Sequence, residues 1–479
     1  MAYHHQDLTE TIIALATPSG IGAIGVIRLS GAQAIEKCNP FFYGKNLEKQ
    51  ASHTIHFGTI RNEAGKIIDE VLVSVFKNPR SYTGENVIEI SCHGSAYIQQ
   101  QVIELFIRNG VRMANPGEFT LRAFLNGKMD LSQAEAVADL ISSDSSASHD
   151  MAMKQMRGGF SKEIQALREE LIRFASLIEL ELDFGEEDVE FANRDDLRAL
   201  VSKIKDVIHQ LILSFQLGNV IKNGVSTVIA GRPNAGKSTL LNALLNEERA
   251  IVSAIAGTTR DTIEESLNIK GIQFRLIDTA GIREATDAIE AIGVEKTMEK
   301  IQQSAILVYV FDRMKMTADQ VYQDIQELEK EELKIILVGN KSDLFEAMPE
   351  QEQRYYLENG NGRNGTVLWS ELKEKYDCIW ISAKEKQRLE LIKNRLHQAV
   401  ISNEIATDNT IVSNLRHYEA LEKSNQALTD VLHGLNMNIT GDFLAQDIRY
   451  SLAHLGEITG EISTDDLLDR IFRDFCIGK

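Results

Sequence analysis

The stretch Gly231-Arg-Pro-Asn-Ala-Gly-Lys237-Ser238 decides the fold of this 479-residue chain. It fits the pattern GxxxxGK[ST] and lies directly between an apolar run, TVIA, and an amphipathic segment, STLLNALL. A strand, a glycine-rich turn and a helix bind phosphates because backbone N–H groups and the positive helix end face the phosphate oxygens. We therefore predict a nucleotide site in which Lys237 contacts the β- and γ-phosphates and acts in catalysis. The Ser238 hydroxyl is predicted to bind Mg²⁺.

Alternating strands and helices surround this motif between residues 223 and 386. The apolar runs TVIA, FRLID, AILVYVFD, KIILVGN and CIWISA are nearly continuous, and helical segments separate them. Strands that are apolar on both faces are typical of a mostly parallel sheet with helices on each side. The sequence therefore predicts an α/β domain with a P-loop.

Three further motifs follow the ends of these predicted strands: Asp278-Thr-Ala-Gly281, Asn340-Lys-Ser-Asp343 and Ser382-Ala-Lys384. Ligands bind at the carboxyl ends of the strands in such sheets. The Asp343 carboxylate can accept hydrogen bonds from the N1–H and 2-amino groups of guanine, which adenine does not offer. The order of the motifs is similar to that in Ras-like GTPases and predicts GTP as the ligand. The predicted GTP-binding residues are Asn234, Ala235, Gly236, Lys237, Ser238, Thr239, Gly257, Thr258, Thr259, Asp278, Thr279, Ala280, Gly281, Asn340, Lys341, Asp343, Ser382, Ala383 and Lys384.

The groups that would assist hydrolysis are less evident. Thr259, in the turn Gly257-Thr-Thr-Arg-Asp261, is predicted as a second Mg²⁺ ligand. Residue 282 after DTAG is Ile, so the Gln that orients the attacking water in Ras-like enzymes is missing. The amide oxygen of Asn234 could bind a monovalent cation that supplies positive charge beside the phosphates. Arg232 is an alternative source of that charge.

Helical sequence lies on both sides of the α/β segment. Between residues 128 and 222 apolar residues recur at the spacing of a long amphipathic helix, and helical sequence returns over 387–479. We therefore expect one helical domain into which the α/β domain is inserted. Residues 1–127 contain short apolar runs broken by Gly, Pro and Ser, which predicts a mixed α/β domain.

Composition excludes several classes of protein. With 51 Lys and Arg against 70 Asp and Glu, the formal net charge is −19, so any contact with nucleic acid requires a local patch or a partner. The four cysteines are far apart and form no CxxC pair, which argues against a zinc site or a disulfide framework and favours the cytoplasm. The sequence has no run of about 18 apolar residues, so we expect no membrane association.

Longer stretches resemble the MnmE (TrmE) family of tRNA-modifying GTPases. They are AGTTRD, DTAGIRE, NKSD and the final FCIGK, together with TPSGIGAIGVIRLSG, SYTGENVIEISCHG and NPGEFTLRAFLNGKMDLSQAEA. The resemblance implies a homodimer held by N-terminal folate-binding domains, a helical domain and an inserted GTPase domain. It also implies an FAD-dependent partner, MnmG (GidA), in a heterotetramer. The pair would add an aminomethyl or carboxymethylaminomethyl group to C5 of the wobble uridine of certain tRNAs.

The resemblance further implies that a 5-formyl- or methylene-tetrahydrofolate supplies the one-carbon unit and that potassium-dependent association of GTPase domains activates hydrolysis. It assigns the potassium ligand to Asn234, with support from Gly257 and Thr258, and the placing of the attacking water to Glu290. Folate contacts fall on Arg28, Glu89, Lys128 and Lys479, and Cys476 is implied to be functionally important. From the residues alone, each of these charges would be a surface charge. The Cys476 thiol could be a nucleophile, a structural group or, on a poor match to C-a-a-X, a lipid anchor.

The nucleotide motifs also fit a different class of function. A GTP-dependent assembly switch, such as a ribosome-maturation factor, would use the same motifs without any modification chemistry. Such a switch has no use for Arg28, Glu89, Lys128 or the CIGK end, so these residues separate the two hypotheses.

Overall fold

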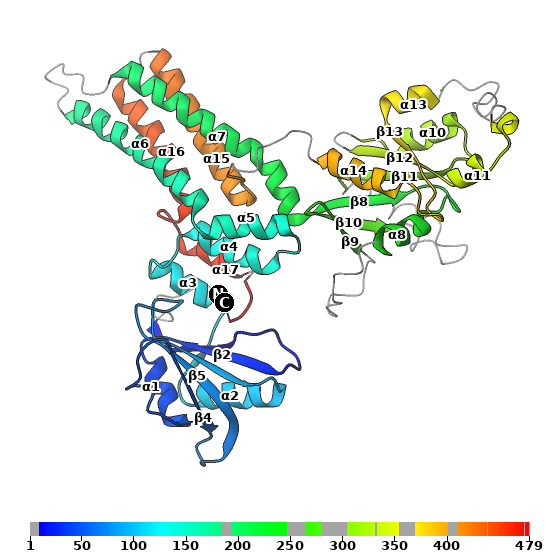
Figure 1. Cartoon of the computed structure of the whole chain (residues 1–479). Coiled ribbons are helices and arrows are strands. Elements are labelled where there is room, and N and C mark those ends of the chain that lie inside the picture. Colours follow the sequence, from blue (N-terminus) through cyan, green and yellow to red (C-terminus); the bar gives the residue numbers. More distant parts are fainter. Residues whose placement is uncertain are drawn as a thin grey trace, which may run out of the picture. The chain divides into compact units, whose positions relative to one another are not determined.

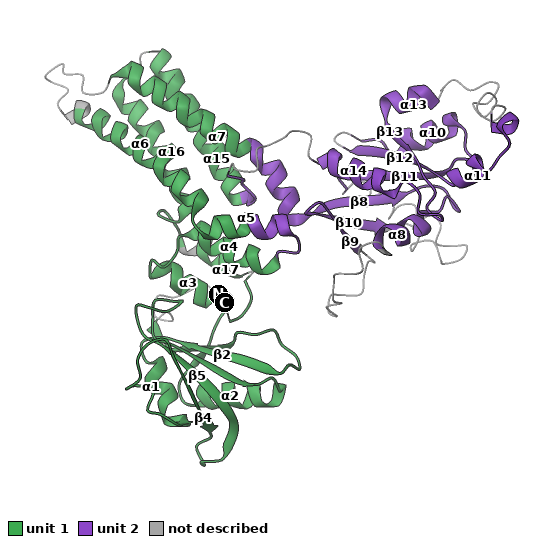
Figure 2. Ribbon diagram, in the orientation of Figure 1, with its two compact units in different colours: residues 1–142, 152–212, 416–479 green, residues 143–151, 213–415 purple. Residues whose placement is uncertain are grey.

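A computed structural model describes residues 9–183, 193–246, 264–278, 304–330, 333–353, 369–400, 410–437, 439–473 and 475–478. The chain divides into two compact units (Figure 2), which are described separately. Unit 1 comprises residues 1–142, 152–212 and 416–479, and unit 2 comprises residues 143–151 and 213–415. Among the described helices, none combines the length and the apolar character needed to cross a membrane.

Unit 1 begins with a seven-stranded sheet in the order β3-β4-β5-β6-β2-β1-β7. All neighbouring strands in it are antiparallel except β1 and β7. Helices α1 and α2 cover one face, where side chains such as Ile35 and Phe106 pack on alternate residues of the strands. The bounds are β1 Ile12–Leu15, β2 Ile24–Ser30, α1 Ala34–Cys38, the 3₁₀ turn η2 Asn39–Phe41, β3 Phe42–Tyr43, β4 Thr54–Arg61, β5 Ile67–Phe76, β6 Val87–His93, α2 Ala96–Arg108 and β7 Arg112–Met113.

The rest of unit 1 is helical. Two long helices, α6 and α16, pack against each other (Figure 1), and α3, α4 and α17 share a small core around Leu131 and Phe472. The spacing of apolar residues predicted a long helix after residue 160, and α6 confirms it. Residues 146–151 of α5 and 213–223 of α7 fall in unit 2. The bounds are α3 Glu118–Leu125, α4 Leu131–Ser142, α5 Ser146–Met156, α6 Gly159–Asp183, α7 Arg194–Asn223, α15 Leu415–Asn436, α16 Gly441–Thr459 and α17 Asp465–Arg473.

Unit 2 contains a six-stranded sheet in the order β13-β12-β11-β8-β10-β9. The five apolar runs noted in the sequence form β8, β10, β11, β12 and β13, which pair in parallel. The edge strand β9 is antiparallel to β10 and was not predicted. The bounds are β8 Val225–Ala230, β9 Glu264–Ile269, β10 Ile272–Asp278, β11 Ile306–Asp312, β12 Lys334–Asn340 and β13 Asp377–Trp380.

Helices cover both faces of this sheet. Alternate strand residues point to opposite faces, so Ile229 packs in the core with α8 and α14, whereas Val228 packs in the core with α10 and α13. The predicted fold class is therefore confirmed: a mixed α/β part, a helical part and a P-loop domain with a mostly parallel sheet. The helix bounds are α8 Lys237–Asn246, α10 Ala318–Leu328, α11 Ser342–Glu346, α13 Trp369–Lys375 and α14 Leu389–Val400.

Candidate functional site

The turn between β8 and α8 requires glycine at two positions. Gly231 has a φ of +148°, and a Cβ there would lie 1.9 Å from the backbone oxygen of Val310 on β11. Gly236 has a φ of +96°, and its Cβ would lie 2.2 Å from the Asn340 amide nitrogen. Only glycine permits such close approach of neighbouring loops. The local structure thus explains the first and second glycines of the GxxxxGK pattern.

The P-loop side chains border an open pocket of about 500 Å³. Lys237, the first residue of α8, is largely buried, and its Nζ donates hydrogen bonds to the carbonyl oxygens of Gly231, at 2.9 Å, and Arg232, at 3.3 Å. The ammonium charge attracts phosphates, and the N-terminus of α8 adds positive potential at the same place. The pocket is lined by Pro233, Asn234, Gly236, Lys237, Ser238, Thr239 and Lys341.

Asn340, the last residue of β12, joins three loops of the site. Its buried amide donates to the carbonyl oxygen of Ala235 at 2.9 Å, and its Oδ1 accepts from the backbone N–H groups of Lys341, at 2.8 Å, and Ala383, at 3.0 Å. The P-loop, the NKSD loop and the SAK loop are therefore held together by one side chain. Asp343 lies half-buried in α11 beside this junction.

Two further P-loop side chains, Arg232 and Asn234, have different surroundings. The Arg232 guanidinium forms two hydrogen bonds of 2.8 Å with the Asp324 carboxylate of α10, and the Tyr309 hydroxyl also donates to Asp324. These bonds raise the pKa of Arg232 and hold its charge on α10. Asn234 has a left-handed φ of +62°, and its side-chain amide has no hydrogen-bond partner among the described residues. Arg232 is thus held on α10, whereas Asn234 is one of the residues that line the pocket.

Several predicted GTP-site residues fall outside the described residues. Asp278 is the last residue of β10, but its side chain is not described. Ser382 and Ala383 follow β13, and Lys384 is exposed next to Glu385. The described residues contain no cluster of three or more His, Cys, Asp or Glu side chains able to hold a metal ion. Gly257, Thr258, Thr259, Thr279, Ala280, Gly281 and Glu290 lie outside the described residues.

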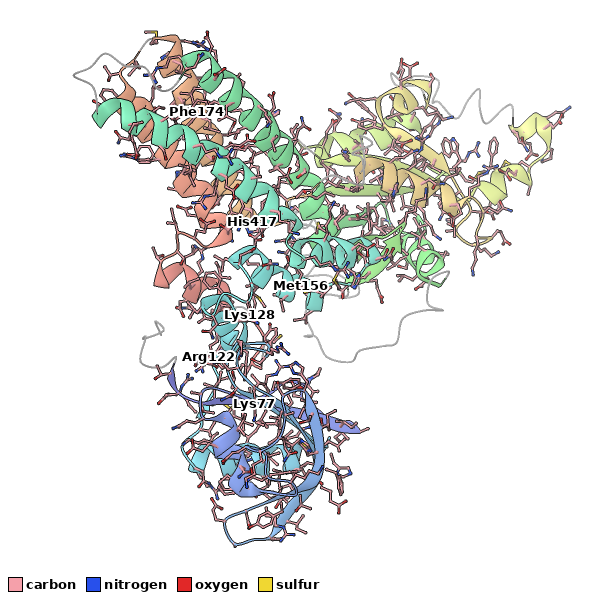
Figure 3. The ribbon with its side chains drawn as sticks, turned by 60° about the vertical axis from the view of Figure 1, so that its left-hand side comes forward. Lys77, Arg122, Lys128, Met156, Phe174 and His417 are labelled. Carbon is pink, nitrogen blue, oxygen red and sulfur yellow. The ribbon has the colours of Figure 1, made fainter. Side chains whose placement is uncertain are left out.

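Part of a second group of predicted residues meets in unit 1. Arg28 on β2 and Glu89 on β6 are register partners and form an ion pair of 2.8 Å. Arg28 Nη1 also donates to the carbonyl oxygen of Gly478 at 3.4 Å, so the end of the chain reaches this pair. The Lys128 ammonium donates to the Pro79 carbonyl oxygen at 3.0 Å, and Figure 3 labels Lys128 near Arg122 of α3. Lys479 lies outside the described residues.

The tail 475–478 is fixed against the region that carries Arg28. Ile477 forms an antiparallel bridge with Pro116, and a Cβ on Gly478 would lie 2.2 Å from the Leu15 carbonyl oxygen. Cys476, the residue before Ile477 in this tail, is exposed. Tyr82 was not predicted as a site residue, but its ring faces the Arg28 guanidinium at 5.4 Å. Tyr82 could have been found from the sequence, because it lies in SYTGENVIEISCHG, one of the stretches that carry the family resemblance.

The chain is similar to several known proteins. The family model of the MnmE helical domain matches residues 131–476, and that of the GTP-binding protein TrmE N-terminus matches residues 11–128. The chain is 55% identical to the tRNA modification GTPase MnmE of Cytophaga hutchinsonii over 98% of each chain. It is also 55% identical to that of Flavobacterium johnsoniae, over 98% of this chain and 99% of the relative. A solved structure of Era from Aquifex aeolicus bound to GDP and AlF4⁻ is 24% identical, with a TM-score of 0.27, over 42% of this chain and 66% of that chain.

Proposed function

Because the chain belongs to the MnmE family and is a tRNA modification GTPase, we propose that it uses GTP hydrolysis to drive the addition of an aminomethyl or carboxymethylaminomethyl group to C5 of the wobble uridine in certain tRNAs. One observation carries this proposal: the tail with Cys476 lies against the Arg28–Glu89 pair in a unit separate from the P-loop. A pure assembly switch has no use for this second group of residues.

The second group has the chemistry of a folate site. The guanidinium of Arg28 and the ammonium groups of Lys128 and Lys479 attract the glutamyl carboxylates, and the Glu89 carboxylate accepts hydrogen bonds from the donor edge of the pterin. The Tyr82 ring beside Arg28 offers a flat apolar surface for the pterin. A 5-formyl- or methylene-tetrahydrofolate bound there supplies the one-carbon unit.

Folate binding by the full chain tests this assignment. Arg28→Ala should raise the Kd for 5-formyltetrahydrofolate about tenfold or more, because a charge-assisted contact is lost from a partly buried site. Arg61→Ala is the matched control, since Arg61 lies on β4 of the same sheet and stacks on Tyr43 instead. Titration calorimetry gives both values. If the parent chain binds no folate, the one-carbon proposal is wrong, whatever the GTPase does.

The GTPase is activated by potassium. Asn234 lines the pocket beside Lys237, which supports this assignment. K⁺ held by its amide oxygen would place positive charge where an arginine finger acts in other GTPases. Gly257 and Thr258 supply backbone oxygens for the ion, and Glu290 places the attacking water. Mg²⁺ is held by Ser238 and Thr259.

Replacing potassium by sodium should sharply reduce the GTP hydrolysis rate of the parent and change that of Asn234→Ala little. Sodium requires shorter bonds to its ligands and so fits a different cavity. Arg232→Ala should keep the parent's preference for potassium, because its guanidinium is bound to Asp324 on α10. Steady-state release of phosphate in matched KCl and NaCl measures all three. If the parent hydrolysed GTP at equal rates in both salts, potassium would have no specific role in hydrolysis.

The protein acts as a homodimer held by residues 1–127 and joins an FAD-dependent MnmG partner in a heterotetramer. An exposed apolar patch on the first sheet, on the face opposite α1 and α2, supports dimerisation. Phe57 and Leu72 are register partners, and strand pairing and side-chain alternation place Ile24 and Ile55 on their face. These four side chains are 47–67% exposed. The net charge of −19 indicates that much of the tRNA contact comes from the partner.

The domain division itself stays a prediction. We assign residues 1–127 to the folate-binding domain, 128–222 and 387–479 to the helical domain and 223–386 to the inserted GTPase domain. The insertion gives the GTPase domain two chain connections to the helical domain, so that its movement is passed on through both.

A further inference from the structure

Asp312 is a buried carboxylate at the carboxyl edge of the GTPase sheet, and no motif of the site includes it. It is the last residue of β11 and only 5% exposed. Its register partner on β12 is Asn340, so the parallel pairing brings it directly to the nucleotide loops. The sequence contained a signal, because Asp312 ends the apolar run AILVYVFD as Asp278 ends FRLID.

The two carboxylate oxygens of Asp312 have different partners. Oδ2 accepts a hydrogen bond of 2.7 Å from the Lys341 ammonium, which is an ion pair. Oδ1 accepts one of 3.0 Å from the backbone N–H of Met314 and so closes the turn after β11. The first contact reaches into the nucleotide pocket, since Lys341 is part of its lining.

Lys341 and the residue that its ammonium contacts, Asn234, both have left-handed backbone conformations. The φ of Lys341 is +65°, and its ammonium donates at 3.0 Å to the carbonyl oxygen of Asn234, whose φ is +62°. Left-handed backbone at a residue other than glycine is unfavourable and persists where surrounding contacts hold it. The single ammonium therefore connects the NKSD loop to the P-loop, and Asp312 fixes the position of that ammonium.

We propose that Asp312 is a positioning residue of the guanine-nucleotide site, which acts by holding Lys341 against the P-loop so that the pocket is formed before the nucleotide binds. Preorganised walls improve affinity because fewer side chains lose freedom on binding. Asp312 itself is not among the residues that line the pocket. This inference needs only the GTPase activity and does not depend on the folate or potassium assignments.

Asp312→Asn tests the proposal with little change in shape. The amide keeps an oxygen for the Met314 N–H but places no negative charge beside Lys341. The Kd values of the full chain for GDP and GTP should rise about tenfold, which is the size expected for a lost charge-assisted hydrogen bond. The kcat at saturating GTP should stay within about twofold, because bound nucleotide restores the position of Lys341. Fluorescent guanine nucleotides and phosphate release give these values.

A matched control and a double variant separate positioning from general stability. Asp377→Asn removes a charge from the same sheet at the start of β13, where Asp377 pairs with Arg395, and should leave both Kd values unchanged. In a Lys341→Met background, Asp312→Asn should change the Kd less than twofold, because its effect passes through Lys341. A further tenfold loss there, or an unchanged Kd in the single variant, overturns the proposal. If Asp312→Asn does not fold, Asp312→Ser keeps a turn acceptor and is judged by the same criteria.

Discussion

Asp343→Asn should lower the affinity for GTP by about a hundredfold or more and create affinity for xanthosine triphosphate. The carboxylate accepts two hydrogen bonds from guanine, and hydrogen bonds to charged groups contribute about 1.5–3 kcal/mol each. The amide that replaces it can accept from N1–H and donate to the 2-oxo group of xanthine, but it meets the 2-amino group of guanine with a donor. Competition between fluorescent nucleotides measures the change in preference.

The hydrolysis of xanthosine triphosphate serves as the control for this variant. Because Asn340 and not Asp343 ties the three loops together, the catalytic part of the pocket should stay intact. The variant should then hydrolyse xanthosine triphosphate at nearly the rate at which the parent hydrolyses GTP. An unchanged preference for GTP would show that the NKSD loop does not read the base.

Glu135→Gln should lower the free energy of unfolding of the helical part of the chain by about 3–5 kcal/mol, the usual cost of breaking a buried ion pair. Glu135 on α4 is almost fully buried and binds two residues at the start of α15. Arg416 donates to both of its carboxylate oxygens, at 2.8 and 2.9 Å, and His417 donates to one of them at 2.7 Å. Figure 3 labels His417 among the helices of unit 1. Removing the carboxylate charge leaves Arg416 and His417 without their counter-charge, although Arg416 still donates to the carbonyl oxygens of Glu457 and Ile458.

The same cluster predicts how stability depends on pH. Burial would raise the pKa of Glu135, but the charges of His417 and Arg416 and their hydrogen bonds outweigh it and lower the pKa from 4.5 to about 2. A lowered pKa in the folded state stabilises the protein above the unfolded value. This contribution is present above pH 4.5 and is lost as the pH falls toward 2. The difference in stability between the parent and Glu135→Gln should shrink over that window.

Thermal unfolding followed by circular dichroism measures both effects, with Glu179→Gln as the matched control. Glu179 on α6 pairs with Arg449 on α16, and both side chains are largely exposed. Exposed pairs contribute about 0–1 kcal/mol. A loss in Glu135→Gln no larger than that in Glu179→Gln would mean that the buried cluster does not stabilise the helical part.

The sequence predicted those parts of the fold in which local pattern and tertiary environment agree. The five buried strands of unit 2 are nearly continuous apolar runs, so they could be predicted from the sequence. β9 was not predicted, because in EESLNI only Leu267 and Ile269 are apolar, which is enough for an edge strand but too little for a pattern. Its pairing with β10 comes from the tertiary structure.

Contacts between residues far apart in the sequence limited how much of the sites could be predicted. The P-loop and NKSD motifs carry their chemistry within a few residues, so their roles could be predicted locally. Glu135 and Arg416 are 281 positions apart, and nothing in either segment indicates the other. Likewise, the pairing of Arg28 with Glu89 depends on the register of two antiparallel strands, which the sequence does not fix. The family resemblance proposed both residues for one site, and the structure brings them into contact.

The central claim is that cleavage of GTP drives modification chemistry carried by another part of the chain. The direct measurement is mass analysis of wobble nucleosides after the full chain, its FAD-dependent partner, folate and tRNA are incubated with GTP or with its β,γ-imido analogue. We expect modified uridine with GTP and almost none with the analogue, which occupies the same pocket but cannot be cleaved. Equal yields of modified uridine with the two nucleotides would contradict it.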